Sequence, residues 1–319
     1  MKLKGIDFGS CFLASGSLNF FGNGWYYDKL YSWTIPGFKK VIETTTFVAK
    51  TTTLNPRPGN MPLKDNFQPR ELKPKCIKVY PFQGVALNSV GLSGPGLRTL
   101  IRKGGWFSIR RPFFISFMAM GNELRDRMDQ THQFVKIFGS ELSEFRAPIG
   151  LQINVSCPNT GHNIQEITKE AKDILKIASV LNLPLDLKIN VFMNTSTVRE
   201  IEDTGLCDIL TLSNTIPFGT QNTGIDWSKF GKDGLSPLQN IGGGGLSGRA
   251  ILPCVLRRIE QLRGDGITLP IKGSGGIMSA DDVDKMKHAG VNGIEIGTVL
   301  MLRPWQAPKI IQRAKELFD

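Results

Sequence analysis

Short apolar runs recur along the chain, separated by stretches in which apolar and charged residues follow a helical period. Eight of these runs are rich in β-branched or aromatic residues, and several are apolar almost throughout. Strands that are buried on both faces of a parallel sheet have this pattern. The predicted strands cover residues 11–15, 46–50, 113–118, 151–156, 185–189, 209–214, 270–275 and 293–298.

The segments between the later strands have the pattern of amphipathic helices, with apolar residues at 3- and 4-residue spacings opposite a charged face. Ser279 is expected to cap one of them. Eight strands alternating with helices predict an α/β fold, a (β/α)8 TIM barrel. The alternative fold is a doubly wound open sheet. Such a sheet usually has a GxGxxG motif after its first strand, and this sequence has no such motif there. The predicted helices cover residues 164–181, 249–263, 280–290 and 307–318.

Two connections are too long to be simple loops, at about 51–112 and 215–248. Connections of this length are usually functional insertions. We expect one domain over residues 1–319, with both insertions at the carboxyl-terminal face of the barrel.

The charge of the chain is strongly basic. It has 319 residues, with 39 Lys and Arg against 28 Asp and Glu, which gives a net charge of +11. Such a charge favours anionic partners. The basic residues are interspersed with acidic ones, and no basic motif with interleaved aromatic residues, as in RNA-binding modules, is present. We therefore expect a solvated basic surface and no specific nucleic-acid partner.

Five sparse cysteines lack CxxC or Cys/His spacing, which indicates a reducing compartment and no metal site. The N-terminal segment has no unbroken apolar core of a signal peptide, and no apolar run reaches 18 residues. We expect a cytoplasmic protein without a membrane span.

Functional side chains of such barrels lie at the carboxyl ends of strands. Here those ends carry Lys50, Asn154, Lys188, Asn214 and Thr215. An unpaired ammonium is costly to bury at a strand end, so this group of residues indicates a site. The last two strands end in glycine-containing segments, which predicts a phosphate site after strands seven and eight. These segments are GSGGI (273–277) and IGTVL (296–300), and GGGGLSG (242–248) is expected to add to their rim.

Cys157 is the one cysteine that the predicted strands place over the barrel mouth. It stands in SCPNTGHN, and Pro158 cannot continue a sheet, so the thiol is expected in a loop. We interpret the other four cysteines as structural. A thiolate at Cys157 would be a suitable base if the site lowers the pKa of the thiol.

Together these motifs resemble the dihydroorotate dehydrogenase family. The matching segments follow the family's order over most of the chain: AKTTTLNPRPGN (49–60), LNSVGLSGPG (87–96), NVSCPNTG (154–161), LSNT (212–215), GGLSGRAI (244–251), GSGGI (273–277) and IGT (296–298). The resemblance implies a flavin mononucleotide (FMN) barrel that oxidises (S)-dihydroorotate to orotate in the de novo synthesis of UMP. Because class 1 members use Cys as the base and class 2 members use Ser, Cys157 makes the chain similar to class 1.

The same resemblance implies roles for individual residues. Cys157 would remove the C5 proton while N5 of FMN accepts the C6 hydride, and Lys188 would lie near the N1–O2 edge of the flavin. The implied substrate residues are Lys50, Asn88, Val90, Gly91, Leu92, Asn154, Asn159, Asn214 and Thr215. The implied FMN residues are Ala14, Ser15, Gly16, Lys50, Thr51, Ser116, Asn154, Lys188, Gly248, Gly275, Gly276, Gly297 and Thr298.

Partners are implied by the resemblance as well. We expect a homodimer, either alone with fumarate as acceptor or paired with an iron–sulfur flavoprotein subunit that passes electrons to NAD. The amino-acid sequences of residues 87–96 and 244–251 slightly favour the second subtype. Residues 19–33 and 218–240 do not follow the family pattern, and the sequence assigns them no role.

Four other functions stay open at this point. A dihydropyrimidine dehydrogenase-type flavin reductase usually has His where this chain has Asn159. A tRNA dihydrouridine synthase would explain the basic charge but normally has a further helical RNA-binding domain. A non-flavin phosphosugar barrel would not need Cys157, and a purely binding role has only the charge to support it.

Overall fold

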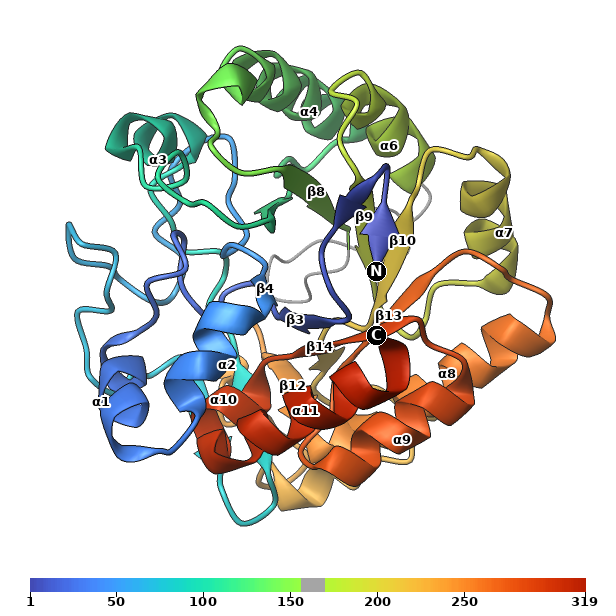
Figure 1. Ribbon diagram of the computed structural model, residues 1–319. Coiled ribbons are helices and arrows are strands. Elements are labelled where there is room, and N and C mark those ends of the chain that lie inside the picture. Colours follow the sequence, from blue (N-terminus) through green and yellow to red (C-terminus); the bar gives the residue numbers. More distant parts are fainter. Residues whose placement is uncertain (156–169) are drawn as a thin grey trace.

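The computed structural model describes residues 1–155 and 170–319, and its centre is an eight-stranded parallel sheet (Figure 1). All eight predicted strands are present, and most of them end one to three residues earlier than predicted. The hydrogen-bonded order is β4-β3-β14-β13-β10-β9-β8-β7. The strands are β3 (Cys11–Leu13), β4 (Thr46–Phe47), β7 (Phe113–Phe117), β8 (Ile149–Asn154), β9 (Leu185–Ile189), β10 (Ile209–Leu212), β13 (Ile271–Ser274) and β14 (Gly293–Ile296).

The two ends of this sheet meet and close it into a barrel. Beyond β4, Val48 forms a parallel bridge with Phe114 of β7, and Thr52 forms another with Phe117. The Ala49 N–H donates to the Phe114 carbonyl at 2.8 Å. These contacts join the two edge strands of the sheet, as barrel closure requires. The predicted (β/α)8 barrel is confirmed.

Helices surround the barrel, as Figure 1 shows. In α6 the buried residues Ala171, Ile174, Leu175 and Ala178 form the predicted stripe, while residues 164–169 of the predicted helix lie outside the described part. Ser279 occupies the N-cap of α9, where its hydroxyl donates to the Asp282 carboxylate. The helices are α1 (Tyr26–Thr34), α2 (Phe38–Thr44), α3 (Leu97–Lys103), α4 (Leu124–Gly139), α6 (Ala171–Ser179), α7 (Thr195–Asp203), α8 (Leu252–Gly264), α9 (Ala280–Ala289), α10 (Thr298–Leu302) and α11 (Ala307–Phe318).

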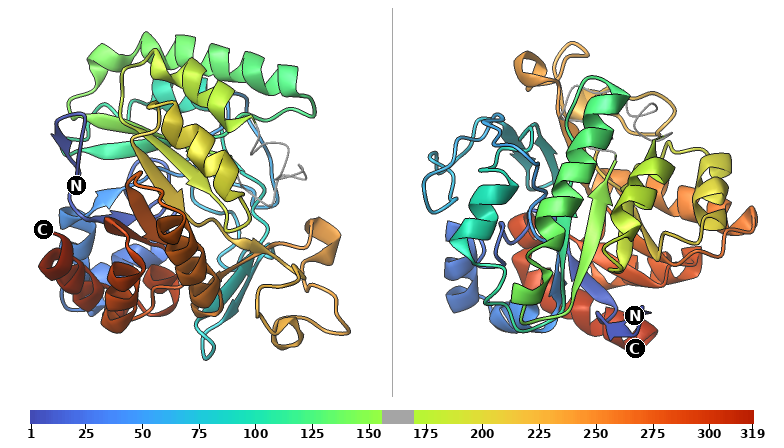
Figure 2. Two further views of the ribbon diagram at one scale, coloured as in Figure 1. Left: turned by 90° about the vertical axis from the view of Figure 1, so that its right-hand side faces the viewer. Right: turned by 90° about the horizontal axis from the view of Figure 1, so that it is seen from above.

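The two long insertions form a second sheet together. Its order is β11-β12-β6-β5, and β12 pairs antiparallel with β6, with Gly245 opposite Asn88. The left view of Figure 2 shows this sheet on the side of the barrel away from both termini. The insertions are therefore ordered structure that shapes the barrel mouth. The strands are β5 (Ile77–Tyr80), β6 (Val85–Asn88), β11 (Ile216–Pro217) and β12 (Gly245–Gly248).

The opposite end of the barrel is closed by the N-terminal hairpin of β1 (Lys2–Leu3) and β2 (Ile6–Asp7). An apolar cluster beneath it includes Leu3, Phe8, Phe12, Val48, Phe114 and Ile209. Within the described ranges, none of the helices combines the length and apolar character needed to cross a lipid bilayer.

Candidate functional site

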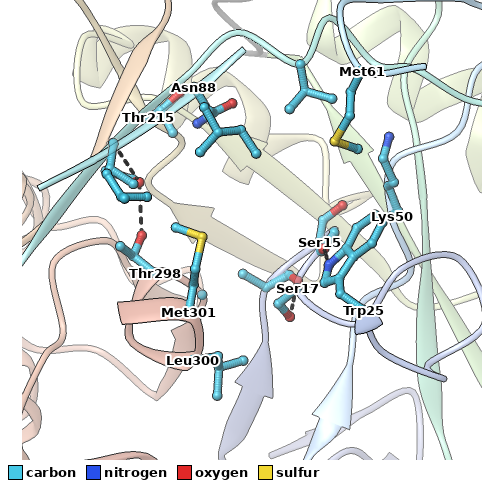
Figure 3. A pocket seen from close by; sticks show the side chains of 18 of the residues that line it. Ser15, Ser17, Trp25, Lys50, Met61, Asn88, Thr215, Thr298, Leu300 and Met301 are labelled. Atoms are coloured by element: carbon cyan, nitrogen blue, oxygen red, sulfur yellow. Dashed lines mark hydrogen bonds between the residues drawn. The ribbon is translucent and has the colours of Figure 1, made fainter. Parts of the chain in front are cut away.

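A cavity of about 990 Å³ opens at the carboxyl ends of the barrel strands, beneath the insertion sheet. Figure 3 shows Ser15, Trp25 and Lys50 on one side of it and Asn88, Thr215 and Thr298 on the other. Residues far apart in the sequence thus meet here. The predicted site residues in its wall are Ala14, Ser15, Gly16, Lys50, Thr51, Asn88, Val90, Gly91, Leu92, Asn154, Lys188, Asn214, Thr215, Gly275, Gly276, Gly297 and Thr298.

Two predicted FMN residues do not line this cavity. Ser116 is fully buried one layer behind it, where its hydroxyl lies 2.9 Å from the Thr51 hydroxyl. Gly248 ends β12, and a Cβ there would lie 2.2 Å from the Gly84 carbonyl oxygen. The glycine at this position therefore permits a close approach between the two insertions.

Two further predicted residues, Cys157 and Asn159, lie outside the described residues. The other four cysteines, Cys11, Cys76, Cys207 and Cys254, are buried and free. Burial raises the pKa of Cys11 to about 12 and that of Cys76 to about 11. Thiols with such pKa values are protonated near neutral pH and make poor bases, which agrees with a structural role.

Lys50 is the cation on the β4 side of the cavity. Its side chain is buried, and Nζ donates to the Ser93 carbonyl at 2.6 Å and lies 5.0 Å from the centre of the Phe20 ring. Because Ser93 belongs to the first insertion, this bond ties the insertion to the barrel rim. A fixed ammonium at this place can stabilise negative charge on a bound molecule.

Amide and hydroxyl groups form a linked row across the cavity. The Asn214 amide donates to the Asn154 carbonyl oxygen at 3.1 Å, and the Asn154 amide contacts the Thr51 hydroxyl at 3.4 Å. Thr51 is in turn 2.9 Å from the Ser15 hydroxyl. Such groups supply both hydrogen-bond donors and acceptors, which suits the polar edge of a heterocyclic ring.

The glycines after β13 and β14 bring backbone close to the cavity. Gly275 and Gly276 have φ angles of +108° and +88°, and a Cβ on Gly276 would lie 2.5 Å from Cβ of Leu252. Next to Gly297, the Thr298 hydroxyl donates to the Ser247 hydroxyl at 2.9 Å. Only glycine lets the backbone take this conformation so close to its neighbours without strain. A backbone of this kind can present N–H groups to an anion.

A buried ion network forms the wall near Lys188, and the sequence interpretation missed most of it. Lys188 Nζ lies 2.9 Å from Glu295 Oε1, and Lys272 Nζ lies 3.1 Å from Glu295 Oε2 and 2.8 Å from Asp186 Oδ2. The Glu295, Lys272 and Asp186 side chains are fully buried. The sequence did offer a sign of this network, because the predicted strands 185–189, 270–275 and 293–298 each contain a charged residue among apolar ones.

The aromatic segment 19–33 also contributes to the cavity, which the sequence did not reveal. Trp25, Tyr26, Tyr27 and Tyr31 all line it. The Trp25 indole N–H donates to the Gly16 carbonyl at 2.8 Å, so this wall is fixed to the loop after β3. Aromatic composition alone had indicated neither the contact nor its place.

Comparison with known proteins provides the assignment. A sequence model of the dihydroorotate dehydrogenase family matches residues 2–318, nearly the whole chain. The chain belongs to the dihydroorotate dehydrogenase family. This is a family of oxidoreductases that oxidise dihydroorotate in pyrimidine biosynthesis, so the family predicted from the motifs is confirmed.

Relatives in this family match nearly all of this chain and most of their own length. The "Dihydroorotate dehydrogenase B (NAD(+)), catalytic subunit" of Anoxybacillus flavithermus is 29% identical over 306 residues, covering 94% of this chain and 85% of the relative. The protein of the same name from Cutibacterium acnes is 28% identical, with 94% and 87% covered. The crystal structure of Eimeria tenella DHODH in complex with ferulenol has a TM-score of 0.68 at 20% identity, covering 98% of this chain and 82% of the other, and supports the fold.

Proposed function

We propose that this chain oxidises dihydroorotate with FMN bound in the barrel-mouth cavity. The observation that carries the proposal is that one cavity gathers two lysines, a row of carboxamides and the glycine-rich ends of β13 and β14. These three kinds of group can bind a substrate that has a carboxylate and a pyrimidine ring together with a phosphorylated planar cofactor. When bound, the flavin supplies the hydride acceptor for C6 of dihydroorotate.

The residues of the cavity fit this cofactor. Gly275, Gly276, Gly297 and Thr298 would hold the phosphate end, and Lys188 would face the flavin ring. The volume of about 990 Å³ leaves room for a substrate beside FMN. Lys50, Asn88, Asn154, Asn214 and Thr215 would then orient the substrate.

The proton step falls to Cys157 in this proposal. As the base, its thiolate would take the C5 proton while the carboxamide row holds the pyrimidine ring in place. The family match supports the assignment, and so do the four other cysteines, which are buried and do not line the cavity.

The experiment is spectroscopic. We expect the purified protein to be yellow, to release about one FMN per chain on denaturation, and to bleach anaerobically when dihydroorotate is added. Dihydrouracil, which lacks the carboxylate, should bleach it far more slowly because it offers no negative charge to Lys50. Protein that takes up no FMN, or flavin-loaded protein that dihydroorotate does not reduce, would overturn the proposal.

We further propose that the electrons leave through a partner subunit to NAD, because the relatives cited above carry "NAD(+)" and "catalytic subunit" in their names. The isolated, reduced chain should then be reoxidised slowly by both fumarate and NAD. Fast turnover with fumarate by the isolated chain would contradict this and favour a homodimeric enzyme that acts alone.

A further inference from the structure

Glu295 stands out among the cavity residues because it is an acid in a place where the bound groups would be anionic. It lies on β14, its side chain is fully buried, and it is part of the cavity wall. Burying a carboxylate beside an anionic ligand costs free energy unless the carboxylate has a compensating purpose.

Glu295 is more than a partner for Lys272. Lys272 already pairs with Asp186 at 2.8 Å, and Asp186 also accepts from Gln152 at 2.8 Å and from Thr211 at 2.7 Å. Lys272 and Asp186 therefore already form a complete ion pair at the deeper end of the network. The second carboxylate, Glu295, is what extends the network upward to the cavity.

The contacts of Glu295 divide between the two levels. Oε2 faces Lys272 at 3.1 Å from below, while Oε1 accepts from Lys188 at 2.9 Å and from the Ser274 hydroxyl at 3.1 Å. A lysine side chain has a flexible stem, and a hydrogen-bonded ion pair restricts it to few conformations. Glu295 thus fixes where the Lys188 ammonium stands.

The carboxylate is charged under all ordinary conditions. Burial raises the pKa of Glu295, but the ammonium groups of Lys188 and Lys272 outweigh that effect and hold it at about 2. The network contains two lysines and two carboxylates, so its formal charges cancel. The positive potential that Lys188 offers to the cavity is therefore partly cancelled by its neighbour.

We propose that Glu295 is a positioning residue that holds the Lys188 ammonium at the cavity wall and, by its charge, lowers the reduction potential of the bound flavin. This inference rests on the proposed binding of FMN. Its physical basis is that reduction adds negative charge to the flavin, and a nearby fixed carboxylate opposes that addition. A lower potential favours passing electrons onward.

The test is the flavin midpoint potential of Glu295→Gln, measured by anaerobic titration with a reference dye. Glutamine keeps the shape and one acceptor oxygen for Lys188 but removes the negative charge. We expect FMN content to be unchanged and the equilibrium to shift toward reduced flavin by about tenfold, which corresponds to a rise of about 30 mV for this two-electron couple. Glu316→Gln, which makes the same charge change on the exposed face of α11, should leave the potential unchanged.

A second variant separates charge from shape. Glu295→Asp keeps the charge but withdraws it by one methylene from Lys188, so the potential should rise less than in Glu295→Gln. If Glu295→Gln does not retain FMN, the midpoint potential of Glu295→Asp is the test of the proposal. A flavin-loaded variant whose potential equals that of the parent, or is lower, overturns the role of Glu295. A parent protein that binds no FMN would instead overturn the proposed function.

Discussion

At the residue scale, the cysteines are divided by their surroundings. Four are buried, and burial raises the pKa of each of these thiols, which keeps them protonated. Cys157 lies outside the described residues, and its role depends on its place in NVSCPNTG and on the family match. The sequence alone distinguished Cys157 from the rest, because only Cys157 directly precedes a proline at a strand end.

Cys157→Ala should bind FMN and orotate nearly as the parent does but slow flavin reduction by dihydroorotate about 10²–10⁴-fold, the usual value of a positioned base. Cys157→Ser should retain some activity with its pH optimum moved upward, because an alcohol is harder to deprotonate. Anaerobic stopped-flow bleaching measures both rates. The matched control is Cys254→Ala, a buried thiol of α8 outside the cavity wall, which should reduce at the parental rate. A fast, flavin-loaded Cys157→Ala would rule this base out.

Asp28 gives a pH-dependent prediction at the same scale. Its carboxylate accepts from the backbone N–H of Trp25 at 2.7 Å, and burial raises its pKa to about 6. A carboxyl whose folded pKa is raised contributes stability that is present at low pH and is lost as the pH rises through that folded pKa.

Urea unfolding between about pH 4 and about pH 7 should therefore show that Asp28→Asn gains stability relative to the parent as the pH rises. Asp65→Asn, at an exposed position, should follow the parent. Parallel pH profiles for Asp28→Asn and the parent would contradict this account of Asp28.

At the scale of elements, the turn after β13 depends on its close fit to α8. Gly276 has a φ of +88°, and any Cβ there meets the backbone and Cβ of Leu252 at 2.5–2.7 Å. The sequence predicted this turn as part of a phosphate site. It could not show that the neighbouring helix leaves no room for a side chain, because that helix begins more than twenty positions earlier.

Gly276→Ala should lower FMN affinity at least tenfold, an effect of about 1.4 kcal/mol or more, and should destabilise the fold because both strain and overlap oppose the methyl group. Flavin fluorescence during dilution measures the affinity. Gly264→Ala is the matched control, since a Cβ there meets nothing within 4 Å and φ is not positive. Normal FMN affinity in Gly276→Ala would show that the turn does not take part in cofactor binding.

At the scale of the whole molecule, the barrel interior carries a charged layer between an apolar floor and the cavity. Lys272 is fully buried, pairs with Asp186 and Glu295, and lies 4.3 Å from the centre of the Phe12 ring. Removing it leaves two carboxylates without their shared cation, and breaking such buried pairs is strongly destabilising.

Lys272→Met should therefore lower the free energy of unfolding by about 3–5 kcal/mol in urea or guanidinium titrations. Lys285→Met breaks a half-exposed pair with Asp282 on α9 and should cost less than about 1 kcal/mol. Equal stability of the two variants would show that the interior layer does not stabilise the barrel through its charges.

Some features followed from the sequence by itself. The apolar runs determined the eight strands and their alternation with helices, because burial on both faces of a parallel sheet demands such runs wherever the strand lies. The polar residues at strand ends were also local signals, and Lys50, Asn154, Lys188 and Asn214 do meet in one cavity. Their convergence follows from barrel geometry, which brings all carboxyl ends to one face.

Other features were decided only by the tertiary structure. The pairing of β12 with β6, the aromatic wall around Trp25 and the link from Lys188 through Glu295 to Lys272 all join segments separated by many residues. A local sequence pattern does not predict which charged residues on different strands will pair. Their pairing depends on the strand order and stagger of the closed barrel. The sequence thus determined the fold and most of the cavity wall, whereas the closed barrel decided the electrostatic surroundings of Lys188.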